Sequence, residues 1–568
     1  MASLVTALDS SVEESKKMKL GENGHCEYSW SNEIQEQIMQ FYFQLLRSDS
    51  AQMQVLNDQL DSLLQKTLTR DSSFYTSVLF RMLAQTRDIV SGKGEYALSY
   101  MMLFSFYTYY PQLALFAVES FVSPEAETTQ PYGSWKDMKY IADYFKTKTN
   151  NKNHQIIEKC IQLINKQLIK DYECDDKSKI SLCAKWVPRE GSKYSWLFKM
   201  LAEDFFKNSV FMGSAKTESS RNGAHKRCYM EYRKIVSNLN KQIDTVQIKQ
   251  CGNVWDTIDH NRTTSITLSR NKKAFLNKTK TGEQRSELVD RITCAQNFEK
   301  YIASRIKSGK EVKGGNVGLD DFTRQAFALL DQYDKNQMET DLLNSQWRSN
   351  SAKNGSLNKM IAMVDTSGSM TGGPLEAAIA LGIRVAEKSI LGKRVLTFDA
   401  KPTWHNLEGL DGFVSMVGSL KKAPWGGNTN IYAAFTLILS SLVEKGIPPE
   451  EVEGMTLAIF SDMQIDQADV SFSQKSLLGT IQKMYEMAGY KCPHILFWNL
   501  RGTSGFPCLS SAPGTSMMSG YSPVLLNLFC EKGAEALDVA TPWNMLLETL
   551  SNSRYNRMDS RIFNHLLV

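Results

Sequence analysis

Hydrophobic residues follow two different spacings along this chain of 568 residues, and the change falls near residue 350. Between about residues 32 and 347, apolar positions recur three and four residues apart, in paired segments separated by short polar or glycine-bearing breaks. In residues 71–110, one apolar segment ends near Val90, a break follows at 91–94, and a second segment returns. This spacing predicts helical hairpins that stack into an α-solenoid of HEAT-like repeats, either open or closed into a ring.

Short apolar runs bounded by polar residues replace this pattern after residue 357. A continuous apolar run indicates a strand buried on both faces, and strands that alternate with helices indicate a doubly wound α/β sheet. We therefore expect a multidomain α plus α/β protein, in which a doubly wound α/β domain follows the solenoid. The predicted strands are 358–364, 393–399, 455–461 and 493–500.

The two patterns and the polar segments between them set the expected domain boundaries. Residues 32–347 form the helical domain and 357–545 the α/β domain, and the polar stretch RSNSAKNGS at 348–356 is expected to be a linker. Residues 1–31 lack the apolar core of a secretory signal and are expected to be a flexible leader. Residues 546–568 are expected to form a tail that packs on the helical domain.

Composition favours a protein inside the cell and away from the membrane. No uninterrupted run of about 18 apolar residues offers a membrane-spanning helix. The ten cysteines are scattered and form no C-x-x-C pair, which favours a reducing compartment over a disulfide framework. We expect a cytoplasmic protein, with a virion as the second location.

Oxygen-bearing side chains recur where predicted strands and loops of the α/β domain meet. One strand runs straight into Asp-Thr-Ser-Gly-Ser, one Asp directly follows strand 455–461, and one Thr lies in a glycine-rich loop just before a helix. Loops at the carboxyl ends of parallel strands hold ligands, and hard cations prefer oxygen. The sequence thus predicts a Mg²⁺ or Mn²⁺ site at Asp365, Ser367, Ser369, Thr429 and Asp462. The alternative is that Asp365 caps the following helix and the serines only shape a turn.

The order Asp-x-Ser-x-Ser, then Thr, then Asp resembles the metal-ion-dependent adhesion site of von Willebrand factor A domains, and all five positions match. The resemblance implies a cation with one open position, which water or the Asp or Glu of a protein partner fills. Asp365 and Asp462 would bring charge, directly or through a bridging water, and the hydroxyls would complete the oxygen shell.

Three stretches of the helical part extend the resemblance: TRDIVSGKGEY at 86–96, PYGSWKD at 131–137 and CAKWVPREGSKYSWL at 183–197. Followed by a von Willebrand A domain, they resemble the Ro autoantigen architecture with its TROVE-type helical domain, and more closely its uncharacterised plant and giant-virus relatives. The resemblance spans roughly residues 35–545 and departs at Tyr96, where the relatives often have Arg. It implies an RNA-binding ribonucleoprotein component, whose helical ring accepts a single-stranded RNA end and whose basic outer surface holds structured RNA.

Two residues of these stretches invite a functional interpretation but are better explained by structure. Arg87 stands beside Asp88 near a predicted helix end, and Trp135 stands within Gly-Ser-Trp-Lys-Asp. An Arg-Asp pair in that position usually forms structural hydrogen bonds, and a Trp in such a loop usually anchors it.

Positive charge is concentrated in the helical part and gives modest independent support for RNA. Residues 191–320 hold 24 Lys and Arg against 13 Asp and Glu, an excess of 11. Two clusters there combine cations with aromatic residues, as binding of phosphates and stacking of bases require. The alternative is two solvated helix faces whose aromatics point into the core. The candidate RNA-binding cations are Lys226, Arg227, Arg233, Lys234, Arg270, Lys272, Lys273, Lys278 and Lys280.

We expect no enzymatic activity, because no pair of nucleophile and base can be identified. The seven histidines also lack the spacing of a catalytic zinc site. The first expectation is therefore a non-enzymatic RNA-binding protein with a metal site. The alternative is a protein-protein interaction scaffold, cellular or virion-associated, without nucleic acid.

Overall fold

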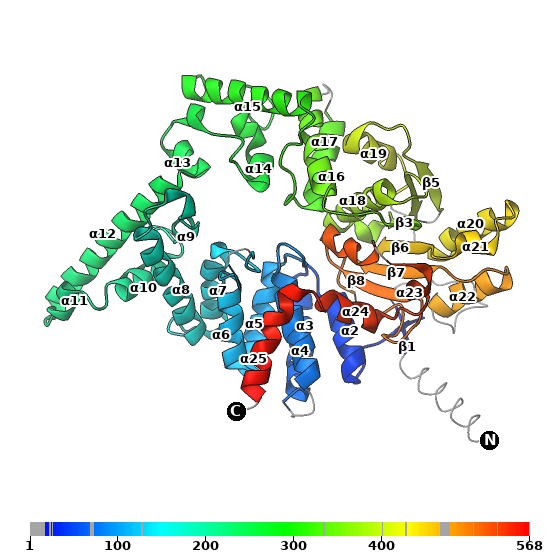
Figure 1. Cartoon of the computed structure of the whole chain (residues 1–568), viewed down its shortest axis with the longest axis horizontal. Coiled ribbons are helices and arrows are strands. Elements are labelled where there is room, and N and C mark those ends of the chain that lie inside the picture. Colours follow the sequence, from blue (N-terminus) through cyan, green and yellow to red (C-terminus); the bar gives the residue numbers. More distant parts are fainter. Residues whose placement is uncertain are drawn as a thin grey trace.

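A computed structural model describes residues 18–21, 24, 26–68, 73–126, 129–332, 336–399, 401–425, 429–465, 477–503, 505–530 and 532–566. Within these ranges an N-terminal helical half is followed by a C-terminal half built on a mixed six-stranded sheet. The prediction of an α-helical region followed by an α/β region is confirmed at this level. Figure 1 shows the two halves side by side.

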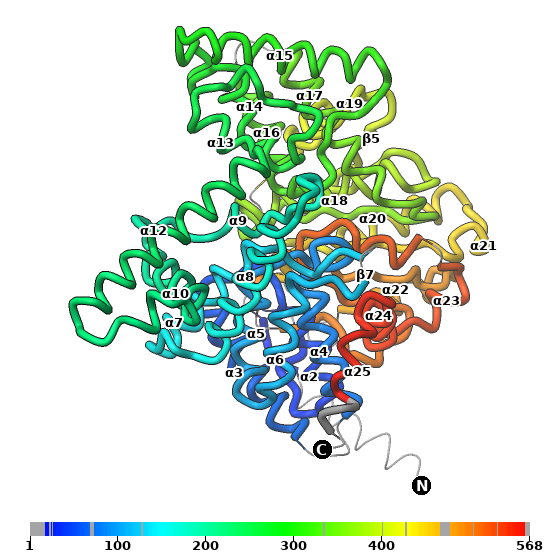
Figure 2. Tube along the Cα trace, turned by 60° about the vertical axis from the view of Figure 1, so that its left-hand side comes forward, coloured from blue at the N-terminus to red at the C-terminus, as the bar shows by residue number. Residues whose placement is uncertain are grey.

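The helical half forms two arms. The first arm leads away from the sheet and contains α2 (Ile34–Gln44), α3 (Ser50–Lys66), α4 (Ser73–Arg87), α5 (Tyr96–Tyr109), α6 (Pro111–Ser120), α7 (Trp135–Thr149), α8 (Gln155–Tyr172), α9 (Cys183–Trp186), α10 (Ser195–Phe205), α11 (Val210–Gly213) and α12 (Glu218–Ile243). The second arm returns to the sheet through α13 (Val246–Cys251), α14 (Ser265–Phe275), α15 (Val289–Lys307), α16 (Leu319–Leu330) and α17 (Gln337–Ser351), as Figures 1 and 2 show.

Local sequence explains where these helices start and which face they bury. Asp49 accepts the backbone N–H of Gln52 at 2.9 Å and so caps α3, which buries a single stripe of leucines, Leu56, Leu60, Leu63 and Leu64. The second arm has a small core of its own, in which Phe275, Phe298 and Ile302 are almost fully buried. The predicted amphipathic helices therefore exist, and their apolar stripes form the cores.

The sheet has the strand order β5-β4-β3-β6-β7-β8. Its strands are β3 (Met360–Asp365), β4 (Arg394–Phe398), β5 (Thr403–Asn406), β6 (Thr456–Ser461), β7 (His494–Asn499) and β8 (Thr515–Ser519). All neighbours are parallel except β4 and β5. In chain order, the strands extend to one side of β3 and then to the other, so the topological switch lies between β3 and β6.

The helices of the C-terminal half are α18 (Gly373–Lys388), α19 (Gly412–Leu420), α20 (Ile431–Glu444), α21 (Pro449–Val452), α22 (Leu477–Met487), α23 (Ala534–Asp538), α24 (Pro542–Leu550) and α25 (Asn556–Leu566). Helix α18 packs on β3, β4 and β6, and α24 packs on β8, whereas α25 leaves the sheet and contacts α4 and α6. The four predicted strands correspond to β3, β4, β6 and β7. Two strands of this sheet escaped prediction: β5 has the half-exposed pattern of an edge, and β8 reads TSMMS, which has no continuous apolar run.

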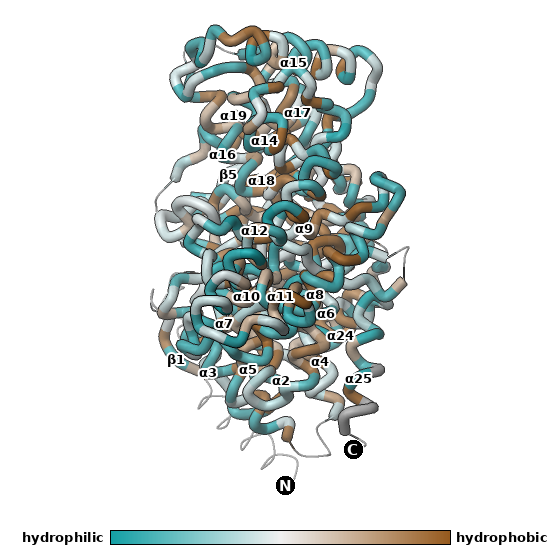
Figure 3. Tube along the Cα trace, turned by 90° about the vertical axis from the view of Figure 1, so that its left-hand side faces the viewer, coloured by the Kyte–Doolittle hydropathy of each residue, from teal (hydrophilic) through white to brown (hydrophobic). Residues whose placement is uncertain are grey.

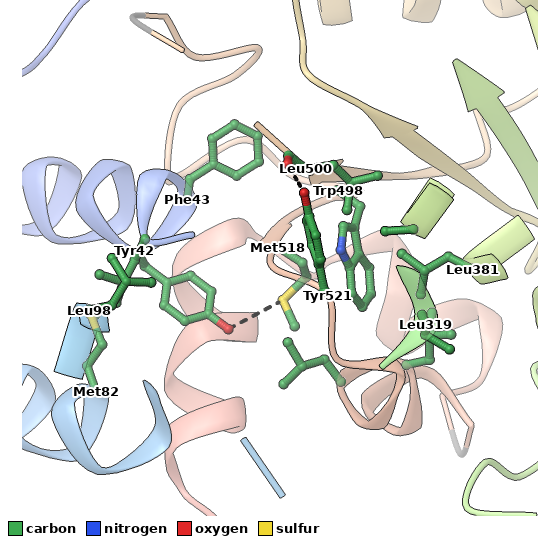
Figure 4. Packing of buried hydrophobic residues seen from close by; sticks show 14 of the residues in the cluster. Tyr42, Phe43, Met82, Leu98, Leu319, Leu381, Trp498, Leu500, Met518 and Tyr521 are labelled. Carbon is green, nitrogen blue, oxygen red and sulfur yellow. Dashed lines mark hydrogen bonds between the residues drawn. The ribbon is translucent and has the colours of Figure 1, made fainter. Parts of the chain in front are cut away.

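Helix α2, the first helix within the described residues, meets β8, the last strand of the sheet, so the path of the chain closes on itself. The Tyr42 hydroxyl lies 4.0 Å from Met518 Sδ, and Asn499 donates to the carbonyl of Phe43 at 3.1 Å. Figure 4 shows Tyr42 and Phe43 beside Met518, Trp498 and Tyr521. One hydrophobic core therefore runs through both halves.

A buried lysine fixes this junction. Lys93 is 5 % exposed, and its Nζ donates to the carbonyls of Tyr42 and Leu45, at 3.1 and 2.8 Å, and to Ser519 Oγ at 2.6 Å. Burial lowers the pKa of this amine. Since Tyr42 and Leu45 lie at the end of α2, Lys93 supplies a donor to carbonyls at the terminus of this helix.

The stretch 348–356 is not the open linker that its polar composition predicts. Its first four residues are the last turn of α17, and Asn350 and Asn354 accept hydrogen bonds from the fully buried Arg384 of α18 at 3.0 and 2.6 Å. The polar residues are here because a buried guanidinium needs acceptors. The two halves are consequently joined by a packed segment.

Both ends of the described chain also pack on the rest of the molecule. In the expected leader, β1 (Met18–Leu20) pairs with β2 (Cys26–Tyr28), and the Tyr28 and Phe506 backbones hydrogen-bond each other; residues 1–17 lie outside the described residues. At the other end, α25 packs on α4, where Arg81 pairs with Asp559 (Figure 2). Among the described helices, none is long and apolar enough to cross a membrane.

Candidate metal centre

The two aspartates of the predicted metal site stand side by side at the topological switch of the sheet. Asp365 is the last residue of β3, and Asp462 directly follows the last residue of the neighbouring β6. Both side chains are fully buried. In open α/β sheets, ligands bind beyond the carboxyl ends of the strands at such a switch.

The loop after β3 brings both serines of the motif close to Asp365. The Ser367 backbone N–H donates to Asp365 Oδ1 at 2.9 Å, and the hydroxyls of Ser367 and Ser369 lie 3.1 Å apart. Helix α18 begins only after Gly372, which has a φ of 94° and is its N-cap. Asp365 therefore does not cap that helix, whereas its bond from the Ser367 N–H does shape the turn after β3, as the alternative to the metal site expects.

The described residues donate hydrogen bonds to both oxygens of Asp365 but to only one oxygen of Asp462. Asp365 Oδ2 accepts from Ser461 Oγ at 2.6 Å, and Asp462 Oδ1 accepts the Gln464 N–H at 3.2 Å. The second oxygen of Asp462, Oδ2, is buried and has no hydrogen-bond partner within the described part of the chain. Its nearest cation is Arg501, whose Nη1 lies 4.0 Å away. A buried carboxylate oxygen without a partner is costly unless a cation or water reaches it.

The pKa values of both aspartates reflect this crowding. Burial, with the negative charge of Asp462 as the second cause, raises the pKa of Asp365 to about 7. Burial also raises the pKa of Asp462, and the nearby Ser369 hydroxyl lowers it in part. Two neighbouring buried carboxylates repel each other when both are charged. A divalent cation between them would remove this repulsion.

Thr429, the fifth predicted ligand, is 2 % exposed, and its loop reaches the same edge of the sheet. The N–H of the following Asn430 donates to the carbonyl of Asp399 after β4 at 3.1 Å. At the other end of the loop, the Pro424 carbonyl accepts from Thr366 Oγ1 at 3.2 Å. Residues 426–428 lie outside the described residues. The structure thus brings four of the five residues into one cluster and anchors the fifth at its border.

These residues fit a hard divalent cation. Two carboxylates and several hydroxyls are the donor set that Mg²⁺ or Mn²⁺ takes, and Asp462 Oδ2 is the acceptor still without a partner. Within the described ranges, no three His, Cys, Asp or Glu side chains gather. A centre at this edge would therefore depend on its hydroxyl ligands.

Sequence reasoning missed two residues of the cluster. Ser461 precedes Asp462 and holds Asp365, and its position at the end of an apolar run was a usable signal. Arg501 follows β7, and its guanidinium donates to the Ser369 carbonyl at 2.6 Å. No local spacing relates Arg501 to Ser369, because they lie 132 residues apart.

The two predicted RNA-binding clusters fall on α12 and around α14, but most of their cations already have partners. Arg233 pairs with Glu190, Lys234 with Glu231 and Lys272 with Glu339. Arg227 stacks on Phe211, and Lys273 donates to the Lys280 carbonyl. In the described part of the chain, six of the nine cations make no ion pair, and four of these, Lys226, Arg270, Lys278 and Lys280, also lack a side-chain contact of the kind that Arg227 and Lys273 have.

The aromatic residues of these clusters belong to the cores. Tyr232 and Phe275 are fully buried, and the Tyr229 hydroxyl donates to Glu203. For Tyr232 and Phe275, the solvated-face interpretation is therefore right, because apolar rings on an amphipathic helix pack inward. Figure 3 shows that α12 is largely hydrophilic along its visible side.

Fold and site together define a two-part protein, in which a helical half closes onto an α/β domain with a carboxylate-hydroxyl cluster at its switch point. Residues 142–352 match the family model described as domain of unknown function DUF2828, and residues 359–558 match the one described as domain of unknown function DUF7788. A curated protein of Acanthamoeba polyphaga mimivirus, "Uncharacterized protein L728", is 30 % identical over 550 residues, which cover 93 % of this chain and 86 % of the viral protein. The chain belongs to the family of this giant-virus protein.

Proposed function

We propose that this protein is a non-enzymatic, intracellular RNA-binding protein of the Ro ribonucleoprotein type. In this proposal the helical half is a HEAT-like, TROVE-type domain that holds RNA, and the C-terminal half is a von Willebrand factor A domain. Its metal-ion-dependent adhesion site binds Mg²⁺ or Mn²⁺ through Asp365, Ser367, Ser369, Thr429 and Asp462, and the bound cation accepts a carboxylate from a protein partner.

The proposed metal-ion-dependent adhesion site is supported mainly by the burial and the hydrogen bonding of the two aspartates. Asp365 and Asp462 are fully buried at adjoining strand ends, and Asp462 Oδ2 lacks a hydrogen-bond partner among the described residues. Bound there, a hard cation would supply positive charge and an open coordination position. Ser461 holds one oxygen of Asp365, and the Ser367 N–H holds the other, so the protein orients this carboxylate in advance.

Charge supports the RNA part. The excess of 11 positive charges in residues 191–320 is a sequence-independent attraction for phosphates. Lys226, Arg270, Lys278 and Lys280 make no ion pair in the described part of the chain and so remain available to a polyanion.

A second candidate is a protein-protein interaction scaffold without nucleic acid. It is favoured by the pairing of Arg233, Lys234 and Lys272 with acidic side chains, and by the burial of Tyr232 and Phe275. In that case the metal site alone would carry the function.

Purification of the full chain from cells, with and without nuclease treatment, separates the two candidates. We expect RNA to co-purify and to be lost after nuclease, and affinity for a labelled RNA to fall steeply with salt. Absence of co-purifying RNA, together with no binding of added RNA at low salt, would establish the scaffold instead.

A further inference from the structure

A group of lysines and aromatic rings that sequence analysis did not select gathers at the start of α7. We name it the lysine-aromatic surface; it consists of Lys136, Lys139, Lys185, Lys193, Tyr96, Tyr140, Trp186 and Tyr194. Lys136 Nζ lies 5.1, 5.3 and 5.8 Å from the ring centres of Tyr96, Tyr140 and Trp186. Lys139 Nζ lies 4.8, 5.4 and 5.1 Å from those of Tyr140, Trp186 and Tyr194.

Four segments far apart in sequence build this surface. Lys136, Lys139 and Tyr140 lie on one side of the first turns of α7, Tyr96 opens α5, Trp186 ends α9, and Tyr194 precedes α10. Helix α7 contacts both α5 and α9, and Figure 1 shows the position of these helices in the first arm. Lys185 and Lys193 add their amines near the rings of Trp186 and Tyr194, at 5.7 and 4.6 Å.

The positive charges of this surface are not balanced by acids. None of its four lysines makes an ion pair in the described part of the chain. Asp137, the acid whose charge acts on Lys136, is already held by both Arg87 Nε and Nη2, at 2.9 and 2.7 Å. Lys136 also stands in the first turn of α7, where the helix dipole disfavours a cation.

Neighbouring cations add to this imbalance. Burial lowers the pKa of Lys136, the charge of Asp137 raises it in part, and the charges of Arg270 and Arg87 lower it again. Burial also lowers the pKa of Lys139, with Lys136 and Lys193 as further causes. Arg270 belongs to α14 in the second arm (Figure 1), so a cation of the second arm also acts on this surface of the first arm.

A purely structural role would be for the lysine stems to cover core aromatics. That role explains Tyr194, which is buried, but it does not explain Tyr96, which is 49 % exposed. It also gives no reason to place four lysines together without an ion pair, or to place Lys136 in the first turn of α7, where the helix dipole disfavours a cation. When charged residues stand against such preferences and no structural gain offsets the cost, a functional surface is the expected reason.

We propose that the lysine-aromatic surface binds a single strand of RNA, with its amines on the phosphates and its exposed rings stacked on bases. The proposal rests on the proposed RNA-binding function and gives it a location. Rings and cations within about 6 Å of each other suit a strand whose phosphates and bases alternate at short range. A duplex would not expose its bases to the rings.

The test uses the full chain and a labelled single-stranded oligoadenylate of about 12 nucleotides, with binding followed by fluorescence anisotropy across a range of salt. The variants are Lys136→Glu with Lys139→Glu, and separately Tyr96→Ala. The matched controls are Lys445→Glu with Lys483→Glu on the other half, and Tyr172→Ala, whose ring is 58 % exposed. Melting temperatures verify that each variant folds.

We expect the double lysine variant to reduce the slope of log affinity against log salt by about 1.4, since each phosphate contact contributes about 0.7. We expect Tyr96→Ala to weaken binding about fivefold or more, because one stacking contact is lost, and both controls to bind as the wild type does. A duplex of the same length should bind without any effect of Tyr96→Ala.

Three outcomes would overturn the proposal, and they differ from one another. If the wild type binds RNA and the surface variants bind equally well, only this location is wrong. If heparin or an acidic peptide binds as tightly as the oligonucleotide and Tyr96→Ala changes nothing, the surface is a general polyanion site. If the wild type binds no RNA at all, the proposed function fails as well.

Discussion

Arg87 holds Asp137 through two parallel hydrogen bonds, from Nε to Oδ1 at 2.9 Å and from Nη2 to Oδ2 at 2.7 Å. The two residues come from the stretches 86–96 and 131–137, and both are buried. A Cβ on Gly133 would lie 2.6 Å from Asp137 Oδ2 and 3.2 Å from Arg87 Nε, so any larger residue here would displace this ion pair. Asp88, the neighbour of Arg87, binds Arg554 near the C-terminus at 2.8 Å. The structural interpretation of the Arg-Asp pair is thereby confirmed.

We predict that Asp137→Asn destabilises the protein by about 3 kcal/mol or more, because it leaves a buried guanidinium without its counter-charge. Urea unfolding of the variant and the wild type, followed by circular dichroism, measures the difference. Asp331→Asn is the matched control, since Asp331 pairs with Lys421 on the surface and such pairs contribute roughly 0–1 kcal/mol. Equal losses in the two variants would contradict the structural role of the buried pair.

Asp365→Ala should abolish stabilisation by Mg²⁺ while the strand β3 remains in place, because the apolar residues of β3 precede this position. A ligand that binds only the folded state raises stability by mass action, so the wild type should melt at a higher temperature in millimolar Mg²⁺ or Mn²⁺ than in chelator. Melting curves of both proteins under the two conditions provide the measurement.

The control for Asp365→Ala is Asp49→Ala, which removes the N-cap of α3. Loss of a cap costs about 1 kcal/mol and should leave the response to Mg²⁺ unchanged. If the wild type melts at the same temperature with metal and with chelator, and titration calorimetry detects no binding, the metal site is wrong.

Arg501→Gln should tighten Mg²⁺ binding, by up to about fivefold. Its guanidinium lies 4.0 Å from Asp462 Oδ2 and half of its side chain is exposed, so it opposes an incoming cation at modest strength. Calorimetric titration of Mg²⁺ into both proteins at one pH measures the change. Weaker binding in the variant would show instead that Arg501 mainly positions the Ser369 loop through the bond to its carbonyl.

His494 makes stability depend on pH. Burial lowers its pKa to about 4, and its ring nitrogens lie 2.9 and 2.8 Å from the Leu537 carbonyl and Ser516 Oγ. Between its folded and unfolded pKa values, the unfolded chain binds the extra proton, so stability falls as pH falls from about 6.5 towards 4. We predict that this group costs about 2 kcal/mol between about pH 7.5 and pH 5. In His494→Gln, the loss of unfolding free energy between these two pH values, measured by urea unfolding, should be smaller by about 2 kcal/mol. An unchanged pH dependence would contradict the prediction.

The sequence by itself determined the secondary structure wherever a local spacing carries the information. The leucine stripe of α3 and the apolar runs of β3, β4, β6 and β7 were readable because helix and strand periods act on neighbouring residues. The same holds for Asp365, Ser367 and Ser369, which sit within five residues of one strand end. Asp462 was predictable too, since it also follows an apolar run.

Only the tertiary structure decided which distant residues meet. Strand β8 is buried because α2 and α24 cover it, although its own sequence shows no strand pattern. Asn350 and Asn354 looked like a linker because their partner, Arg384, lies thirty or more residues away. Arg501 and the lysine-aromatic surface could not be predicted from the sequence for the same physical reason. Their contacts depend on distance in space, and the spacing of residues along the chain gives that distance only within a single helix or strand.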